Sequence, residues 1–120
     1  MKYYSNEIVF RGHPDKVCDQ ISARLLQEYI SGDINTRAGI EVCGGKGMIF
    51  ITGEVTSNTE VDVVGVTNQV LQEIGYKQEY NIINNIGKQS HDISIGVDNG
   101  GAGDQGMMFG YACNDNACYI

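Results

Sequence analysis

A histidine, a proline, an acid and a base stand next to one another at His13, Pro14, Asp15 and Lys16. Proline suits the first turn of a helix, and a helix that begins here would present free N–H groups and its positive dipole end. An anion beside His13 and Lys16 would be well placed, and phosphate is the natural candidate. A capped helix start with a surface lysine accounts for the same spacing.

A pair of acids follows the histidine along the expected helix. Asp15 and Asp19 lie about one helical turn apart, so their carboxylates can face a common cation. Mg²⁺ takes one or two protein carboxylates and completes its shell with water and substrate oxygens. Magnesium next to a phosphate is therefore one hypothesis, and ordinary acids in the first turn of a helix are the alternative.

Two further acids, Glu41 and Glu54, lie in β-rich runs on either side of Gly44–Gly47. These runs predict a hairpin. If Cys43 pairs with Met48, both glutamates project from the same face, whereas a slip of one residue separates them. Glutamates that only face solvent fit the pattern as well.

A glycine-rich stretch, GVDNGGAGDQG, has Asp104 as its central acid and follows GKQS, which contains Gln89. Its many N–H groups can approach an anion closely because glycine has no side chain. The stretch is either a functional loop or a flexible linker.

The elements that must position these residues form an α+β pattern. Apolar residues at helical spacing predict a first helix that begins at Pro14 and is stopped by Gly32 after Ser31. Thr59 and Asp62 resemble a capping box for a second helix, which Gly75 closes. The expected strands are 5–10, the two arms of the hairpin in 38–55, 80–86, and a strand that begins near 107.

Composition bounds the class of protein. The chain has 120 residues, of which 42% are hydrophobic and 19% charged, so a folded domain is expected. A net charge of −7 argues against a nucleic-acid partner. No run approaches the roughly 20 apolar residues of a membrane span, and no secretory signal is visible, so a cytoplasmic location without a membrane partner is expected.

Taken together, GHPDK at 12–16, GKQS at 87–90 and GAGDQGMMFGY at 101–111 resemble the S-adenosylmethionine synthetases, also called methionine adenosyltransferases. The resemblance covers the first part of a family member. It implies an α+β fold whose sheet carries helices on one face. Residues 1–98 would form the N-terminal domain, and residues 99–120 the glycine-rich loop and first strand of a truncated central domain.

The resemblance also implies a reaction. ATP and L-methionine would give S-adenosylmethionine, pyrophosphate and phosphate, with Mg²⁺ and K⁺ as cofactors, and the loop from Gln89 onward would match the family's mobile gate. The implied roles are His13 as the catalytic residue against the triphosphate, Lys16 and Asp104 at ATP, Glu54, Gln89 and Asp104 at methionine, Asp15 at Mg²⁺ and Glu41 at K⁺.

Several departures from the family pattern bear on function. Arg11 stands where an acid is common, His91 stands where proline is common, and the loop between Gly96 and Gly101 is shorter than in many relatives. The later cationic motifs of the family are absent, so we expect this chain alone to be inactive. The resemblance implies a homo-oligomer or a complementing chain; a non-catalytic association module and a stand-alone phosphate-binding unit are the alternatives.

Overall fold

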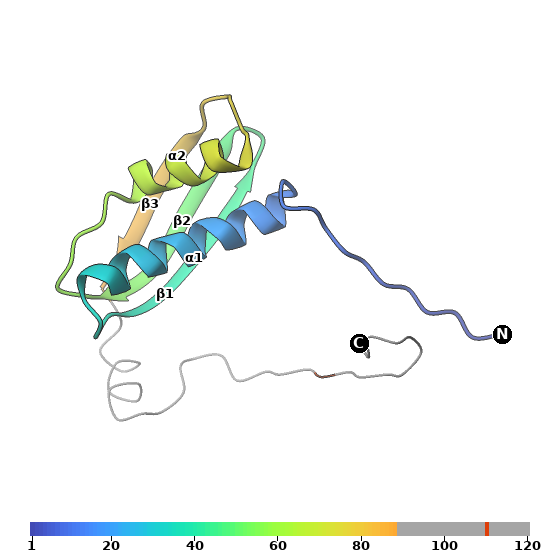
Figure 1. The fold of residues 1–120 in the computed structure, drawn as a ribbon, viewed down its shortest axis with the longest axis horizontal. Coiled ribbons are helices and arrows are strands. Elements are labelled where there is room, and N and C mark those ends of the chain that lie inside the picture. Colours follow the sequence, from blue (N-terminus) through green and yellow to red (C-terminus); the bar gives the residue numbers. More distant parts are fainter. Residues whose placement is uncertain (89–109, 111–120) are drawn as a thin grey trace. The chain divides into compact units, whose positions relative to one another are not determined.

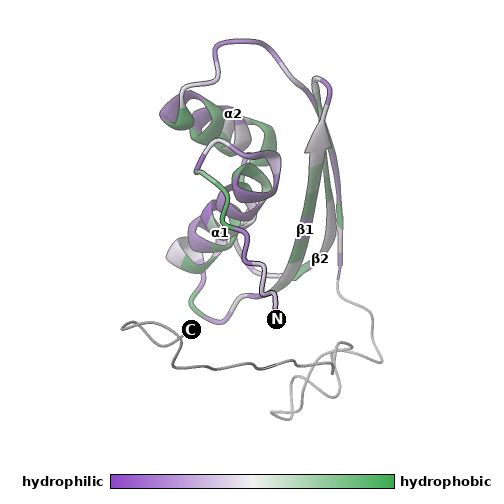
Figure 2. Cartoon of the chain, turned by 90° about the vertical axis from the view of Figure 1, so that its right-hand side faces the viewer, coloured by the Kyte–Doolittle hydropathy of each residue, from purple (hydrophilic) through white to green (hydrophobic). Residues whose placement is uncertain are grey.

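A computed structural model describes residues 1–88 and residue 110. It contains one three-stranded sheet in the order β1-β2-β3, and both helices lie on the same side of it (Figures 1 and 2). The expected α+β fold with helices on one face is confirmed. Neither of the described helices is long and apolar enough to cross a bilayer. The elements are α1 (Pro14–Gly32), β1 (Arg37–Gly45), β2 (Met48–Thr56), α2 (Val63–Ile74) and β3 (Asn81–Gly87).

Helix α1 forms as its sequence predicts. Pro14 occupies its first turn and His13 is its N-cap. Its buried stripe recurs every four residues, which places one face against the sheet. The helix runs one residue further than expected, through Gly32, because the Asp33 N–H still donates to the Tyr29 carbonyl at 2.9 Å. The buried α1 residues are Val17, Ile21, Leu25 and Tyr29.

The hairpin between β1 and β2 is tighter than predicted. Cys43 pairs with Phe50, and Gly45 pairs with Met48, so the register considered from the sequence, with Cys43 opposite Met48, is not the one formed. The turn has only two residues, Lys46 at φ 51° and Gly47 at φ 79°. Two positive φ angles are what a two-residue hairpin turn requires, and a lysine at the first of them gave no sequence signal. The shift is two residues, so the side chains keep the predicted faces.

Helix α2 is also confirmed, but its cap differs from the prediction. Asp62 alone is the N-cap, and its carboxylate accepts from the Gly65 N–H at 3.1 Å. Thr59 lies before the helix and packs against Gly32 at the end of α1, where any larger residue would strike its side chain. Gly75 ends α2 in the left-handed conformation at φ 113°, as expected.

The core lies between the helices and the sheet. Strand β3 pairs in parallel with β2, so α2 serves as the crossover connection between them. Ile51 and Leu25 are fully buried. Burial of each such side chain contributes roughly 1.5–3 kcal/mol. The core cluster is Val17, Ile21, Leu25, Ile49, Ile51, Val63, Val70 and Leu71.

The opposite face of the sheet is open within the described part of the chain. Phe50 and its neighbour Ile83 are each 39% exposed, and Met48 is 47% exposed. Large apolar side chains on a sheet face are ordinarily covered by another layer. We call these three residues the open sheet face.

The predicted strand at 5–10 is not formed. Residues 1–10 lie outside any helix or strand, and Ile8 and Phe10 are exposed. A strand needs a neighbour for its N–H and C=O groups, and no described strand pairs with this segment. Local alternation of apolar residues was therefore an insufficient signal.

Candidate functional site

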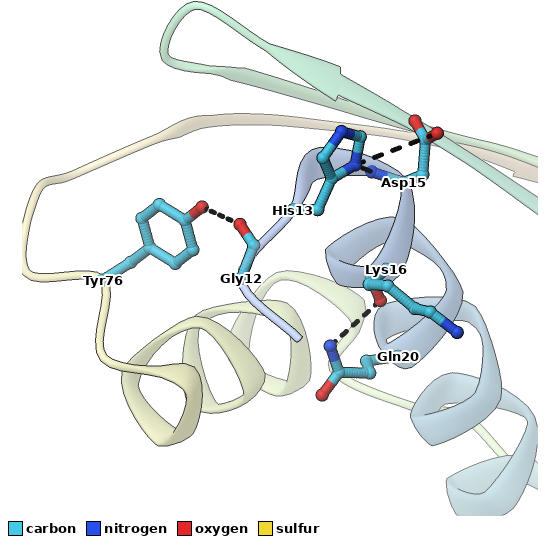
Figure 3. Close-up of polar contacts among 6 residues, drawn as sticks. All are labelled: Gly12, His13, Asp15, Lys16, Gln20 and Tyr76. Carbon is cyan, nitrogen blue, oxygen red and sulfur yellow. Dashed lines mark hydrogen bonds and ion pairs between the residues drawn. The ribbon is translucent and has the colours of Figure 1, made fainter. Parts of the chain in front are cut away.

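His13 is fixed at the start of α1 through one ring nitrogen. Its Nδ1 accepts a hydrogen bond from the Asp15 N–H at 3.2 Å (Figure 3). A neutral imidazole that accepts at Nδ1 carries its hydrogen on Nε2. The side chain is 44% exposed. His13 can therefore donate through Nε2–H to a group outside the described residues.

The first turn of α1 offers few backbone donors. Pro14 has no N–H, the Asp15 N–H is taken by His13, and the Val17 N–H donates to the His13 carbonyl at 2.9 Å. Among the described residues, no acceptor is found for the Lys16 N–H. The donors left for an anion are the Lys16 N–H, its ammonium group and the His13 Nε2–H.

Asp15 extends from the same turn into solvent. Its side chain is 82% exposed, and one carboxylate oxygen lies 3.9 Å from His13 Nδ1. No cluster of three or more potential metal ligands is found within residues 1–88 and 110. An exposed carboxylate fits Mg²⁺ only if phosphate and water oxygens supply most of the coordination shell.

The turn before His13 is tied to α1 by Gln20. The Gln20 amide donates to the Arg11 carbonyl at 2.9 Å and to the Lys16 carbonyl at 3.0 Å. The Arg11 side chain donates in return to Gln20 at 2.7 Å. The Arg11 side chain is thus engaged in holding the turn.

A second tie comes from Tyr76, just beyond α2, whose hydroxyl donates to the Gly12 carbonyl at 2.5 Å (Figure 3). Neither Gln20 nor Tyr76 was predicted from the sequence to support the site. For Gln20, its place in the GHPDKVCDQIS stretch was the available signal. For Tyr76, a separation of 64 residues left no signal in the spacing.

A cavity of about 160 Å³ lies behind this turn. Its walls include Pro14, Cys18, Tyr76 and the hairpin residues 44–47, so Lys46 is a further cation near the start of α1. Burial, with smaller effects from Cys43, Asp15 and Asp19, raises the pKa of the Cys18 thiol. Cys18 therefore remains a neutral wall residue at neutral pH.

Glu41 and Glu54 lie elsewhere. Glu41 pairs with Thr52 and Glu54 with Gly39, so both side chains belong to the same face of the sheet, the one opposite the helices. Strand β2 runs six residues from the hairpin to Glu54, about 20 Å at the usual rise per residue. The hairpin is the part of the sheet that borders the start of α1. The described part of one chain therefore does not bring Glu54 to His13.

Among residues 1–88 and 110, the ligand set for K⁺ is likewise incomplete. Glu41 is exposed, and the Thr52 hydroxyl belongs to the residue opposite it. A carboxylate and a hydroxyl are suitable hard ligands, but a cation needs more oxygens than these. Gln89, Asp104, His91 and the expected strand near 107 lie outside the described residues.

Known proteins are similar to this chain in sequence and in fold. Residues 1–96 match the family model for the N-terminal domain of S-adenosylmethionine synthetase. The chain belongs to the S-adenosylmethionine synthetase family. The matched segment includes GHPDK, at the helix start described above.

Individual synthetases agree with the family match. The chain is 42% identical to the S-adenosylmethionine synthase of Mycoplasmopsis synoviae over 99% of its own length and 33% of that protein. It is 43% identical to the S-adenosylmethionine synthase of Azobacteroides pseudotrichonymphae over 98% of its length and 31% of that protein. The chain spans about a third of these relatives.

A solved structure is similar as well. An unusual S-adenosylmethionine synthetase from Campylobacter jejuni superposes with a TM-score of 0.64 at 27% identity. The match covers 69% of this chain and 26% of that one. The expected synthetase fold is therefore confirmed for the first part of the chain.

Proposed function

We propose that this chain is the N-terminal part of a cytoplasmic methionine adenosyltransferase. The activity would convert ATP and L-methionine into S-adenosylmethionine and triphosphate, and water would then hydrolyse the triphosphate to pyrophosphate and phosphate. The observation that carries the proposal is the GHPDK turn, which combines a family motif with a donor geometry suited to phosphate.

The proposed reaction depends on hydrogen-bond donors to the leaving group and does not depend on a general base. In this reaction the neutral methionine sulfur attacks the ribose 5′ carbon and triphosphate leaves with the bonding electrons. Because the attacking sulfur carries no proton, no general base is needed. Negative charge grows on the leaving oxygen, so hydrogen-bond donors held in place beforehand lower the barrier. In this proposal the His13 Nε2–H and Lys16 are two of those donors.

The negative charge of the triphosphate also calls for cations, and Mg²⁺ and K⁺ are the proposed cofactors. Mg²⁺ would neutralise phosphate oxygens when bound, and the exposed Asp15 carboxylate fits a shell shared with those oxygens. K⁺ would take Glu41 as one ligand. Gln89, Glu54 and Asp104 remain the proposed contacts to methionine, and Asp104 also to ATP.

The proposed site needs a second chain or further domains. A triphosphate carries about four negative charges, and this chain has a net charge of −7. Glu54 lies on the other face of the sheet from α1, so one described chain does not join the proposed methionine and triphosphate contacts. A homo-oligomer or a complementing chain would supply the missing groups.

A complementation assay tests the proposal. The chain is mixed with the remaining two thirds of the Mycoplasmopsis synoviae relative, together with ATP, methionine, Mg²⁺ and K⁺, and S-adenosylmethionine is measured by mass spectrometry. We expect product from the mixture and none from either part alone. Product from this chain alone would contradict the proposed division of the site, and no product from a mixture that associates would contradict the proposed function.

A second candidate function is association without catalysis. The open sheet face supports it, because exposed Met48, Phe50 and Ile83 suit a covering protein layer. Such a module would bind a synthetase and change its rate without using His13. The same assay separates the two functions when His13 is replaced.

A further inference from the structure

The hydroxyl of Tyr76 reaches the turn that carries His13 from the far end of α2. It donates to the Gly12 carbonyl at 2.5 Å, and the Tyr76 ring lies beside the turn that precedes α1 (Figure 3). Gly12 immediately precedes the N-cap histidine. The contact therefore joins the end of one helix to the beginning of the other.

This contact completes the restraint of one peptide group. The carbonyl of the Gly12–His13 peptide accepts from Tyr76, and its N–H donates to the Phe10 carbonyl at 2.9 Å. A planar peptide with both polar groups bonded cannot rotate without breaking one of them. The orientation of this plane fixes how the chain enters His13, and with it the Cα–Cβ bond from which the imidazole extends.

Tyr76 is itself held firmly. Gly75 adopts φ 113°, which lets the Tyr76 N–H donate to the Leu71 carbonyl at 3.0 Å in the capping pattern of a helix end. The Tyr76 ring meets the Tyr80 ring edge to face, with centroids 5.8 Å apart and planes at 82°. A hydroxyl on so restrained a ring can define the position of the carbonyl that it binds.

A role in stability alone explains the contact less well. The Gly12 carbonyl belongs to an exposed residue, where water can replace a lost donor. Exposed hydrogen bonds therefore contribute little to the free energy of unfolding. Water can satisfy the carbonyl, but it does not hold the Gly12–His13 peptide in one orientation. That orientation matters where a hydrogen-bond donor must meet one oxygen of a leaving group.

We infer that Tyr76 is a positioning residue for His13. Its hydroxyl fixes the Gly12–His13 peptide, which keeps His13 Nδ1 in reach of the Asp15 N–H and so directs Nε2–H away from the helix. The effect on catalysis rests on the proposed function, whereas the effect on the histidine does not.

The first experiment measures the histidine directly. The ¹⁵N-labelled chain is studied by long-range ¹H–¹⁵N NMR of its imidazoles as wild type, Tyr76→Phe and Tyr80→Phe, with His13→Gln to assign the signals. Tyr76→Phe keeps the ring contact and removes only the hydroxyl. We expect the fraction of His13 with its hydrogen on Nδ1 to rise about threefold, as the loss of one modest hydrogen bond allows.

Tyr80→Phe is the matched control. It also removes one phenol hydroxyl, but that hydroxyl accepts from Gln78 and does not touch the turn. We expect it to leave the His13 signals unchanged. An unchanged tautomer ratio in Tyr76→Phe, or an equal change in both variants, overturns the inference whether or not the chain supports synthesis of S-adenosylmethionine.

The second experiment uses the complementation assay. We expect Tyr76→Phe to lower kcat roughly threefold to tenfold, with the KM for methionine and the melting temperature little changed. Tyr80→Phe should match the wild type. A kcat that is unchanged in Tyr76→Phe contradicts positioning. If a mixture that associates is inactive, the proposed function fails, while the NMR result still decides the role of Tyr76.

Discussion

At the scale of single residues, the GHPDK turn is characterised by which of its hydrogen-bond donors already have acceptors within the chain and which do not. His13 uses Nδ1 to cap α1, and Pro14 removes one N–H, so the turn keeps Nε2–H and Lys16 for a ligand. The sequence pattern predicted the helix start and identified these residues as candidates for an anion site. It did not predict that the cap would favour the tautomer with its hydrogen on Nε2, because that depends on the distance between the Asp15 N–H and His13 Nδ1.

Asp33 carries a pH-dependent contribution to stability. Its carboxylate accepts from the Asn58 N–H at 2.8 Å and from the Asn35 N–H at 3.0 Å, and these bonds lower its pKa from the ordinary 3.8. A carboxyl whose pKa is lower in the folded state stabilises the fold above its unfolded pKa. That contribution is lost as the pH falls through the folded value.

We therefore expect Asp33→Ala to lower the free energy of unfolding at pH 7, and the deficit to shrink as the pH falls below about 4. Urea unfolding at a series of pH values measures both quantities. Glu28→Ala, on an exposed position of α1, is the control for removal of a carboxylate. A deficit for Asp33→Ala that is the same at pH 7 and pH 3 would rule out this origin.

At the scale of elements, helix spacing and strand composition predicted most of the fold. Buried residues four apart identified α1, and β-rich runs identified the hairpin and β3. Two features escaped. The hairpin register depended on Lys46 accepting a positive φ, and residues 5–10 have the alternation of a strand but no partner.

Gly53 tests the β1–β2 pair. It has φ 126°, and a side chain there would overlap the backbone carbonyl of Gly39 on the facing strand. We expect Gly53→Ala to reduce the free energy of unfolding by on the order of 3 kcal/mol, because strain and a backbone clash act together.

Gly45→Ala is the matched control for that substitution. Gly45 lies on the same hairpin, and a side chain there would meet no atom within 4 Å. Chemical denaturation of both variants should separate them clearly. Equal stabilities would mean that β1 and β2 approach less closely at Gly53 than described.

At the scale of the whole molecule, the described residues would supply parts of the proposed site rather than all of it. The proposed triphosphate contacts lie at His13 and Lys16, and Glu41 and Glu54 share the face of the sheet opposite the helices. Their separation from His13 could not be read from the sequence, because it depends on the packing of α1 across the sheet. Gln89 and Asp104 remain predictions.

Two observations favour assembly with a further protein layer: the open sheet face, and the limited share of each relative that the chain spans. Exposed Phe50 and Ile83 suit a partner layer, and the chain spans about a third of each relative. Assembly and catalysis should therefore be separable, with the apolar face serving the first and the helix start serving the second.

The most direct test of the central claim is the rate of S-adenosylmethionine formation by the complemented mixture when His13 is replaced by alanine. Gln69→Ala, on the exposed side of α2, is the control. We expect His13→Ala to lower the rate about a hundredfold or more while association is retained, as loss of a donor at a leaving group does, and Gln69→Ala to have no effect. An unchanged rate with His13→Ala would contradict a catalytic role for the GHPDK turn and favour association alone.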